Sequence, residues 1–203
     1  MKKINDIFYS LQGEGHNTGR AAVFIRFAGC NLRCPFCDTE FDSYREMTDA
    51  DIVKAIGHYG SRFVVLTGGE PTLQADEAFV ELLHSHGYEV AMESNGTRPA
   101  PKNLDWLTVS PKRPSGGRME LRGERMPDEI KIVFGEDTHP EEMLAALMSA
   151  LPQHAVSPQK YLQPCDTGNE QQNARITARC VDYILKHPEW RLSLQTHKLI
   201  NIK

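Results

Sequence analysis

The sequence predicts an α/β fold in which a mostly parallel β-sheet curves into a partial, incomplete barrel. Short apolar segments that favour strands alternate along the chain with segments of helical periodicity, as is typical of βα units. The 203 residues hold seven such strand segments, whereas a complete eight-stranded βα barrel typically needs about 250 residues. The chain has no internal repeat and no long polar linker, so we expect one domain over residues 1–203.

The predicted strands are runs of β-branched, aromatic and other apolar residues that end at glycine, proline or polar residues. The run Phe-Val-Val-Leu-Thr at 63–67, which Gly68 and Gly69 break, is representative. The predicted strands lie at residues 21–27, 63–67, 88–93, 106–109, 129–134, 161–163 and 191–195. Ligands of parallel α/β folds bind at the carboxyl ends of the strands, so we expect the functional residues there.

Two helices are predicted in the first half of the chain. Thr48 can cap a helix that ends near Gly57. Residues 75–86 have a helical pattern that ends at Gly87, a residue suited to the position after a helix.

Two further helices are predicted in the second half, at residues 141–151 and after Asn169, which can cap the last one. The last helix has an apolar stripe beside which Cys180 is expected to pack. The stripe consists of Ala174, Ala178, Val181, Ile184 and Leu185. Residues 110–128, rich in Pro, Gly and Arg, are predicted to form a long loop.

Composition excludes several classes of function. Lys and Arg number 23 and Asp and Glu 27, which gives a formal net charge of −4, so no general attraction to nucleic acid is expected. No segment has about 18 consecutive apolar residues, so no membrane span is expected. The polar Asn5 and Asp6 interrupt any N-terminal apolar run, so a secretory signal is not expected and the cytoplasm is the predicted compartment.

The segment Cys-Asn-Leu-Arg-Cys-Pro-Phe-Cys at residues 30–37 directly follows the first predicted strand. Its three cysteines are suited to a metal centre, because closely spaced cysteines in a reducing compartment commonly bind metal. A structural zinc site and an all-cysteine [4Fe–4S] site both normally use four ligands, so three leave one position open. The alternative is a zinc site that Cys165, Cys180 or a histidine completes.

The spacing C-x3-C-x2-C, with the aromatic Phe36 before the last cysteine, resembles the radical S-adenosylmethionine (SAM) superfamily. Thr-Gly-Gly-Glu at residues 67–70 is similar to the motif that binds the SAM amino group in that family, and Glu70 offers a carboxylate for it. The resemblance implies a [4Fe–4S] cluster whose open iron SAM chelates. It also implies a 5′-deoxyadenosyl radical that abstracts a hydrogen from the substrate.

A narrower resemblance extends over nearly the whole chain. It rests on Leu-Gln-Gly-Glu-Gly at 11–15, Cys-Asp-Thr at 37–39, Thr-Gly-Gly-Glu-Pro at 67–71, Glu-Ser-Asn-Gly at 93–96, Ser-Pro-Lys at 110–112, Leu-Gln-Pro at 162–164 and Arg-Leu-Ser-Leu-Gln-Thr-His-Lys at 191–198. In this pattern the chain resembles the 7-carboxy-7-deazaguanine synthase family of queuosine and 7-deazapurine biosynthesis. The family is a lyase that converts 6-carboxy-5,6,7,8-tetrahydropterin to 7-carboxy-7-deazaguanine. The radical takes the C6 hydrogen, the ring contracts and ammonia leaves; the enzyme also needs magnesium.

The resemblance implies a role for each matched residue. It assigns the cluster to Cys30, Cys34 and Cys37, and magnesium to Thr39. It assigns SAM to Phe36, Cys37, Asp38, Gly69, Glu70, Ser110, Pro111, Lys112, Gln163, Pro164, Cys165 and Asp166. It assigns the pterin to Leu11, Gln12, Gly13, Arg26, Thr67 and His197.

The residue types alone support some of these roles and leave others open. Arg26 lies between apolar residues of a strand, where a guanidinium would meet an anion such as the substrate carboxylate. Thr39 is by type more typical of a turn, and Asp38 would be the better magnesium ligand by charge. Cys165 is by type a small buried residue whose backbone matters more than its sulfur.

Two other classes of function remain open at this point. One is a different radical SAM enzyme, such as an activase of a glycyl-radical enzyme, and the other is a zinc-binding module without catalysis. The expected partners are a flavodoxin- or ferredoxin-like electron donor and a second copy of the chain, since a partial barrel leaves strand edges to cover.

Overall fold

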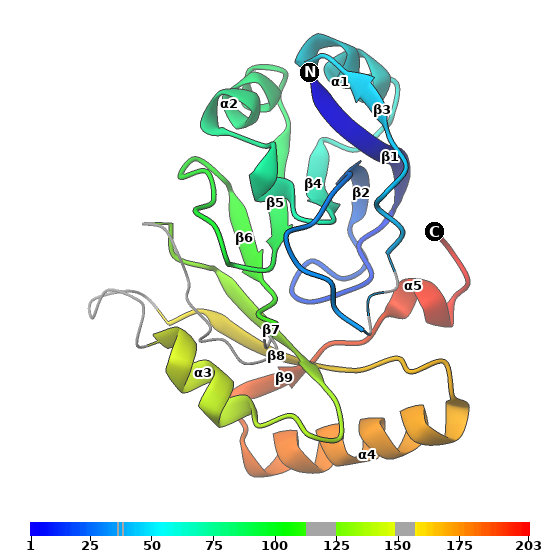
Figure 1. Ribbon diagram of the computed structural model, residues 1–203, viewed down its shortest axis with the longest axis vertical. Coiled ribbons are helices and arrows are strands. Elements are labelled where there is room, and N and C mark those ends of the chain that lie inside the picture. Colours follow the sequence, from blue (N-terminus) through cyan, green and yellow to red (C-terminus); the bar gives the residue numbers. More distant parts are fainter. Residues whose placement is uncertain (36, 38, 113–124, 149–156) are drawn as a thin grey trace.

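A computed structural model describes the chain except residues 36, 38, 113–124 and 149–156 (Figure 1). Its described strands form one sheet in the order β3-β1-β2-β4-β5-β6-β7-β8-β9. The strands are β1 Lys2–Leu11, β2 Ala21–Phe27, β3 Arg45–Met47, β4 Phe63–Gly68, β5 Glu89–Ser94, β6 Trp106–Val109, β7 Glu129–Phe134, β8 Gln159–Pro164 and β9 Trp190–Leu192. Along this order, all neighbouring pairs from β2 through β4 to β9 are parallel. Strand β1 is antiparallel to both of its neighbours, β2 and β3. Because the order runs from β3 to β9 without rejoining, the described sheet is an unclosed barrel, as predicted.

All seven predicted strands are confirmed with small shifts of their ends, and β1 and β3 are additional. The antiparallel strand β1 was not predicted because its apolar residues do not alternate. Its register with β2 shifts between Ile4 and Asp6, so that Ile4 packs in the core under the helices and Phe8 packs on the other face of the sheet. A bulge of this kind breaks the period of two by which a strand is recognised in a sequence.

The outer face of the sheet is covered by α1 Asp49–Ile56, α2 Glu77–Ser85, α3 Pro140–Met148 and α4 Glu170–Lys186 (Figure 1). The short α5 Thr196–Leu199 lies beside the turn after β1, and a 3-10 helix lies at Pro71–Leu73. Thr48 caps α1 in a capping box with Asp51, and Asn169 caps α4, as predicted. The prediction for 75–86 is corrected at its start, because Asp76 caps α2 and the preceding residues turn into the 3-10 helix. The end of the predicted helix 141–151 lies outside the described residues.

The predicted apolar stripe of the last helix is only partly confirmed, because Ile184 packs against the core but other members are exposed. Ile176 and Cys180 form the buried face of α4, whereas Ala174 and Ala178 are exposed and Leu185 is 76% exposed. The error arose because alanine, which is common on both faces of a helix, was counted as apolar. Cys180 packs in the core as expected, with α3 and the second half of the sheet.

The two faces of the sheet have different roles: the outer face packs against helices, and the inner face lines a cavity. On the outer face, one core cluster packs β2, β4, β5 and β6 against α1 and α2, and a second packs β7 and β8 against α3 and α4. On the inner face, Phe8 stacks on Phe24 with ring centroids 4.9 Å apart, and polar side chains take over toward the strand ends. None of the helices in the described residues is long and apolar enough to cross a membrane.

Candidate functional site

A cavity of about 410 Å³ opens on the inner face at the carboxyl ends of the strands. Its walls come from the turn after β1, the cysteine loop after β2, and the ends of β4, β5, β7 and β8. The C-terminal segment also contributes lining residues, namely Gln195, His197 and Lys203. The cavity thus lies where a parallel sheet is expected to bind its ligand.

The cysteine loop brings all three predicted thiols to the cavity wall. Cys30, Cys34 and Cys37 line it, and the amide of Cys37 donates to the carbonyl of Cys34 at 3.1 Å. To hold a cluster, the three sulfur atoms must lie farther apart than the sulfur ligands of a single metal ion. One zinc ion would draw its thiolate sulfurs to about 3.8 Å of one another, since each Zn–S bond is about 2.3 Å. Among the described residues, one group of three side chains has all its ligand atoms within 4.8 Å of one another, and that group lies on the outer face. The sulfur atoms of the three cysteines do not meet this distance. The three sulfur atoms therefore do not form a preformed ligand set for a single zinc ion.

Cys180, which the zinc alternative offered as a fourth ligand, is fully buried in the outer core. Cys165 does line the cavity, on the opposite wall at the end of β8, where its amide donates to the carbonyl of Phe134 at 2.8 Å. Its sulfur contacts the carbonyl of Asp166 at 3.8 Å.

The glycines after β4 are required by the packing of the cysteine loop. Gly68 has φ +127°, and a Cβ there would lie 2.2 Å from the carbonyl oxygen of Phe27. A Cβ at Gly69 would lie 2.0 Å from the carbonyl oxygen of Gly29, immediately before the first cysteine. These two glycines therefore allow the backbone after β4 to approach the backbone that leads into the cysteine loop.

Glu70 is fully buried and does not line the cavity. Its Oε1 accepts hydrogen bonds from the amide and hydroxyl of Thr72 and the hydroxyl of Ser94, and its Oε2 accepts one from the amide of Asn95. These four bonds tie β4 to the turn after β5. In this geometry Glu70 positions the cavity wall, and its contact with the SAM amino group stays a prediction.

The six residues predicted to bind the pterin all line the cavity: Leu11, Gln12, Gly13, Arg26, Thr67 and His197. Arg26 is only partly buried, and its guanidinium lies 5.4 Å from the centre of the Phe8 ring. Its Nε is buried without a hydrogen-bond partner among the described residues. A buried donor without an acceptor is costly, so this one fits an anionic ligand.

Most of the residues predicted to bind SAM also line the cavity. Those that line the cavity are Cys37, Gly69, Ser110, Lys112, Gln163, Pro164, Cys165 and Asp166. Pro111 is not among the lining residues, and Phe36 and Asp38 lie outside the described residues. Thr39 lines the cavity two residues after the third cysteine, and its magnesium role stays a prediction.

Sequence reasoning missed a buried charged cluster in the cavity wall. Lys131 of β7 donates to Glu14 Oε2 at 2.6 Å and to Glu93 Oε2 at 2.9 Å, and its own side chain is only 4% exposed. Burial would raise the pKa of Glu14, but Lys131 outweighs it and holds that pKa at about 2. Burial raises the pKa of Glu93 in spite of Lys131. The segment Glu-Ile-Lys-Ile-Val-Phe at 129–134 carried the signal, because alternate charged residues in an apolar parallel strand must face a polar interior.

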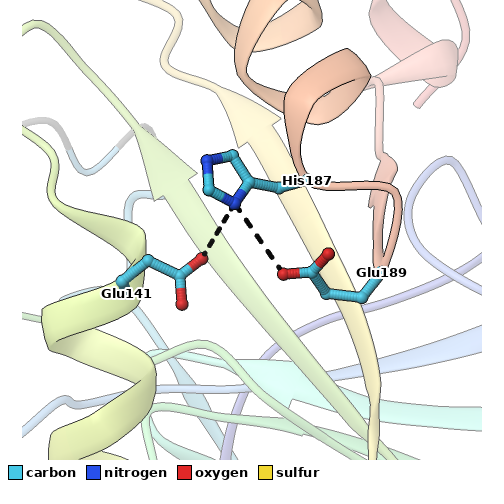
Figure 2. Close-up of side chains that lie close together, drawn as sticks. All are labelled: Glu141, His187 and Glu189. Carbon is cyan, nitrogen blue, oxygen red and sulfur yellow. Dashed lines mark ion pairs between the residues drawn. The ribbon is translucent and has the colours of Figure 1, made fainter.

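A second cluster of ligand-type side chains lies on the outer face (Figure 2). His187 Nδ1 is 3.7 Å from Glu141 Oε1 and 3.9 Å from Glu189 Oε1. The Glu141 oxygen already accepts hydrogen bonds from the Tyr183 hydroxyl at 2.6 Å and Trp190 Nε1 at 3.2 Å. All three members are more than a third exposed, so ion pairing accounts for the cluster without a metal.

Comparisons with known proteins agree with this geometry. The family model described as the radical SAM superfamily matches residues 24–117. The chain is 48% identical to the 7-carboxy-7-deazaguanine synthase of Bacteroides thetaiotaomicron over 100% of both chains. It is 41% identical to that of Bordetella pertussis over 98% of both. The crystal structure of QueE from Escherichia coli superposes with a TM-score of 0.80 at 30% identity, over 95% of this chain and 93% of that one.

Proposed function

Because the chain belongs to the 7-carboxy-7-deazaguanine synthase family of radical SAM enzymes, we propose that it converts 6-carboxy-5,6,7,8-tetrahydropterin to 7-carboxy-7-deazaguanine with loss of ammonia. The observation that carries the proposal is the content of one cavity. It combines three thiols with an unsatisfied buried guanidinium nitrogen and a set of carboxylates.

Membership of the radical SAM family brings a [4Fe–4S] cluster and SAM, which together supply the radical that removes the C6 hydrogen when both are bound. Cys30, Cys34 and Cys37 would hold the cluster. The lining residues from the ends of β4, β6 and β8 would hold SAM beside it: Gly69, Ser110, Lys112, Gln163, Pro164, Cys165 and Asp166.

The opposite wall would bind and orient the pterin. Arg26 would hold its carboxylate, because a guanidinium pairs with a carboxylate through two hydrogen bonds. The pterin ring presents N–H donors on its pyrimidine edge, and Glu14 and Glu93 are acceptors at that depth of the cavity. His197 packs against Gly13 so closely that a Cβ on that glycine would lie 2.1 Å from its Nδ1, and the pair would form one flat side of the pterin site.

We further propose that Thr39 binds a magnesium ion together with the substrate and water. A single hydroxyl oxygen makes a weak site that needs substrate to complete an octahedral shell. Thr39→Ala should therefore raise the magnesium concentration that gives half-maximal activity and leave the Kd of SAM unchanged. An unchanged magnesium response would return Thr39 to the role of a turn residue.

The proposed setting is the cytoplasm, where thiols stay reduced, with electrons from a flavodoxin- or ferredoxin-like donor. The proposed assembly is a homodimer, since β3 and β9 are the edges of an unclosed sheet. Sedimentation of the reconstituted enzyme would test the assembly.

Anaerobic reconstitution followed by assay tests the main proposal. The enzyme, supplied with SAM, a strong reductant, magnesium and the carboxypterin, should yield 7-carboxy-7-deazaguanine detectable by mass spectrometry. Cys34→Ala should lose iron and SAM cleavage, whereas the matched variant Cys180→Ala, in the outer core, should keep both. Bound zinc without iron or sulfide would refute the assignment to catalysis. Cleavage of SAM without the deazaguanine would instead favour the other candidate, an activase of a glycyl-radical enzyme.

A further inference from the structure

The turn at residues 12–16 forms the pterin side of the cavity, and distant segments hold it in place. The carbonyl of Gly13 accepts hydrogen bonds from the amide and the hydroxyl of Thr196, both at 3.0 Å. The amide of Gly15 donates to the Ser193 hydroxyl at 3.0 Å. These contacts all reach the turn from the C-terminal segment.

The sheet contacts the turn as well: Lys131 binds Glu14, Glu93 accepts from Gln12 and Trp106 stacks on His16. A further contact from the sheet reaches the backbone of the turn. Glu129, the first residue of β7, is 1% exposed, and its Oε2 accepts a hydrogen bond from the amide of His16 at 2.9 Å. Its Oε1 is buried with no hydrogen-bond partner among the described residues. A Cβ on Gly15 would lie 2.1 Å from that oxygen. The carboxylate therefore fits directly under the backbone of Gly15 and His16 and does not line the cavity.

We propose that Glu129 is the positioning residue of the pterin-binding turn, which it holds through the His16 amide, and that Gly15 is required because only a glycine fits over this carboxylate. The inference rests on the proposed function, since it takes the turn at 12–16 to be the pterin side of the site.

The chemistry of Glu129 is poorly suited to a merely structural role. Burying a carboxylate with one satisfied oxygen costs free energy, and a Gln or an apolar residue would avoid that cost. Burial and the neighbouring Glu93 raise the pKa of Glu129 to about 7. Lys131 and Glu14, the other charged groups of the same wall, face it as well. The hydrogen bond from the His16 amide nevertheless ties the Glu129 side chain to the turn, and an oxygen acceptor at this position is what the turn requires.

Gly15 and Gly19 make a matched pair for testing the contact. Both have positive φ, +64° and +86°, so an alanine is strained at either position. Nothing lies within 4 Å of a Cβ built on Gly19, whereas the Cβ of residue 15 would collide with Glu129. Any excess effect of Gly15→Ala over Gly19→Ala therefore measures the Glu129 contact.

The first measurement is amide hydrogen exchange across residues 12–20 of the reconstituted enzyme. Glu129→Ala should speed exchange there by roughly tenfold or more, because the His16 amide loses its acceptor and stays buried without a partner. Glu129→Gln keeps a carbonyl for the His16 amide and should restore protection. The control is Asp128→Asn, a neighbouring carboxylate that accepts from the Leu107 amide at 2.8 Å and should leave the turn unchanged. Unchanged exchange in Glu129→Ala would overturn the inference, whatever the substrate is.

The second measurement is the Kd of 6-carboxypterin, a stable oxidised analogue of the substrate, by fluorescence titration. Glu129→Ala should weaken it roughly tenfold, with the Kd of SAM within twofold of wild type and Glu129→Gln near wild type. Gly15→Ala should weaken binding more than Gly19→Ala. The double variant Gly15→Ala/Glu129→Ala should lose less than the sum of the single losses, because removing the carboxylate relieves the collision. Additive losses, or equal losses of pterin and SAM affinity, would contradict the positioning role.

The two proposals fail in different ways. If wild type binds no 6-carboxypterin and forms no deazaguanine, the proposed function is wrong, and hydrogen exchange still decides whether Glu129 holds the turn. If wild type is active and the variants do not alter exchange or pterin affinity, the proposed function stands and the role of Glu129 is wrong.

Discussion

Lys131 is the cation on which two buried carboxylates of the cavity wall depend. Glu14 makes the shorter bond to it, at 2.6 Å, and also accepts from Gln195 Nε2 at 3.0 Å. Glu14 is therefore the partner that is ionised at all ordinary pH values, in agreement with its pKa of about 2. Glu93 shares the same ammonium at 2.9 Å and also accepts from Gln12 Nε2 at 3.3 Å, so ionisation of the wall is coupled to the pterin side of the cavity.

We expect Lys131→Met to lower the free energy of unfolding by about 3–5 kcal/mol near pH 7, since it leaves buried carboxylates without a partner. Denaturant unfolding would measure the loss. The pKa of Glu14 is lowered by folding, so its contribution is present above pH 4.5 and disappears as the pH falls toward 2. The difference between variant and wild type should therefore shrink in acid, and a difference that stays constant with pH would contradict the pairing. Lys160→Met, on neighbouring β8, is the control.

Glu129→Gln should stabilise the protein, and more so at alkaline pH. The pKa of Glu129 is about 7 when folded and 4.5 in an exposed chain, so the folded state binds the proton more tightly between these values. The free energy of unfolding of the wild type therefore falls by at most about 3 kcal/mol as the pH rises from 4.5 to 7. Above pH 7 the contribution of Glu129 to that free energy no longer changes. The glutamine does not ionise, so the Tm gain of the variant should grow from pH 5 to pH 8. A gain that does not depend on pH would show that Glu129 does not hold this proton.

Single residues were predictable where their type allowed one chemistry. The three cysteines and Arg26 lie in the cavity as the sequence indicated. Glu93 and Lys131 were missed because their strands were recognised by apolar content, which does not say which way a charge points. The direction follows only once the neighbouring strands on both sides are known.

At the scale of elements, Glu141 joins α3 to the turn between α4 and β9 (Figure 2). Its Oε1 receives the Tyr183 hydroxyl and the Trp190 indole and faces His187, whose ring stacks on Tyr183 at 4.2 Å. The hydrogen bond from Tyr183 is the main reason why the pKa of Glu141 is lowered. A single carboxylate therefore connects three segments of the outer face.

Glu141→Ala should cost about 1–3 kcal/mol of stability, because it leaves the Trp190 indole without its acceptor in a largely buried site. The matched control is Glu189→Gln, which removes only the ion pair with His187 at 3.9 Å and should cost less than 1 kcal/mol. Thermal unfolding at pH 7 would compare them. Equal losses would mean that the ion pairs, rather than the hydrogen bonds, hold α3.

The elements that the sequence did not predict are those whose stability comes from their partners. β3 has three residues and pairs only with β1 among the described strands, and α5 has four residues with no side-chain cap. Neither is long enough for a periodic signal, since one turn of helix and one strand pair are unstable alone. By contrast, α1 and α4 were predicted from their caps. The side chains of Thr48 and Asn169 each accept a hydrogen bond from a backbone amide three residues later, so the signal is local.

At the scale of the whole molecule, the C-terminal segment completes the site by packing on the turn that follows β1. The parallel sheet supplies its ligands from strand ends, but β1 runs antiparallel and delivers the turn at 12–16 to the same edge. The C-terminal segment then closes over that turn, through Thr196 and His197 on Gly13 and through the hydrogen bond from Ser10 to the carbonyl of Lys203 (Figure 1). A contact between residues about 180 positions apart leaves no trace in local periodicity, so this closure was indicated only by the family resemblance, which assigned His197 to the pterin.

Removing residues 196–203 should therefore separate folding from pterin binding. The truncated chain keeps all nine strands of the described sheet and both outer cores, so its Tm should fall by only a few degrees, as expected for a loss near 1 kcal/mol. Its affinity for 6-carboxypterin should fall at least roughly tenfold, because Gly13 loses both hydrogen bonds from Thr196 and the contact with His197. Thr196→Val, which removes only the hydroxyl bond, should lie between the truncated chain and wild type. Full pterin affinity in a stably folded truncated chain would mean that the turn after β1 holds its shape without the C-terminus, and that Glu129 and Ser193 are sufficient to position it.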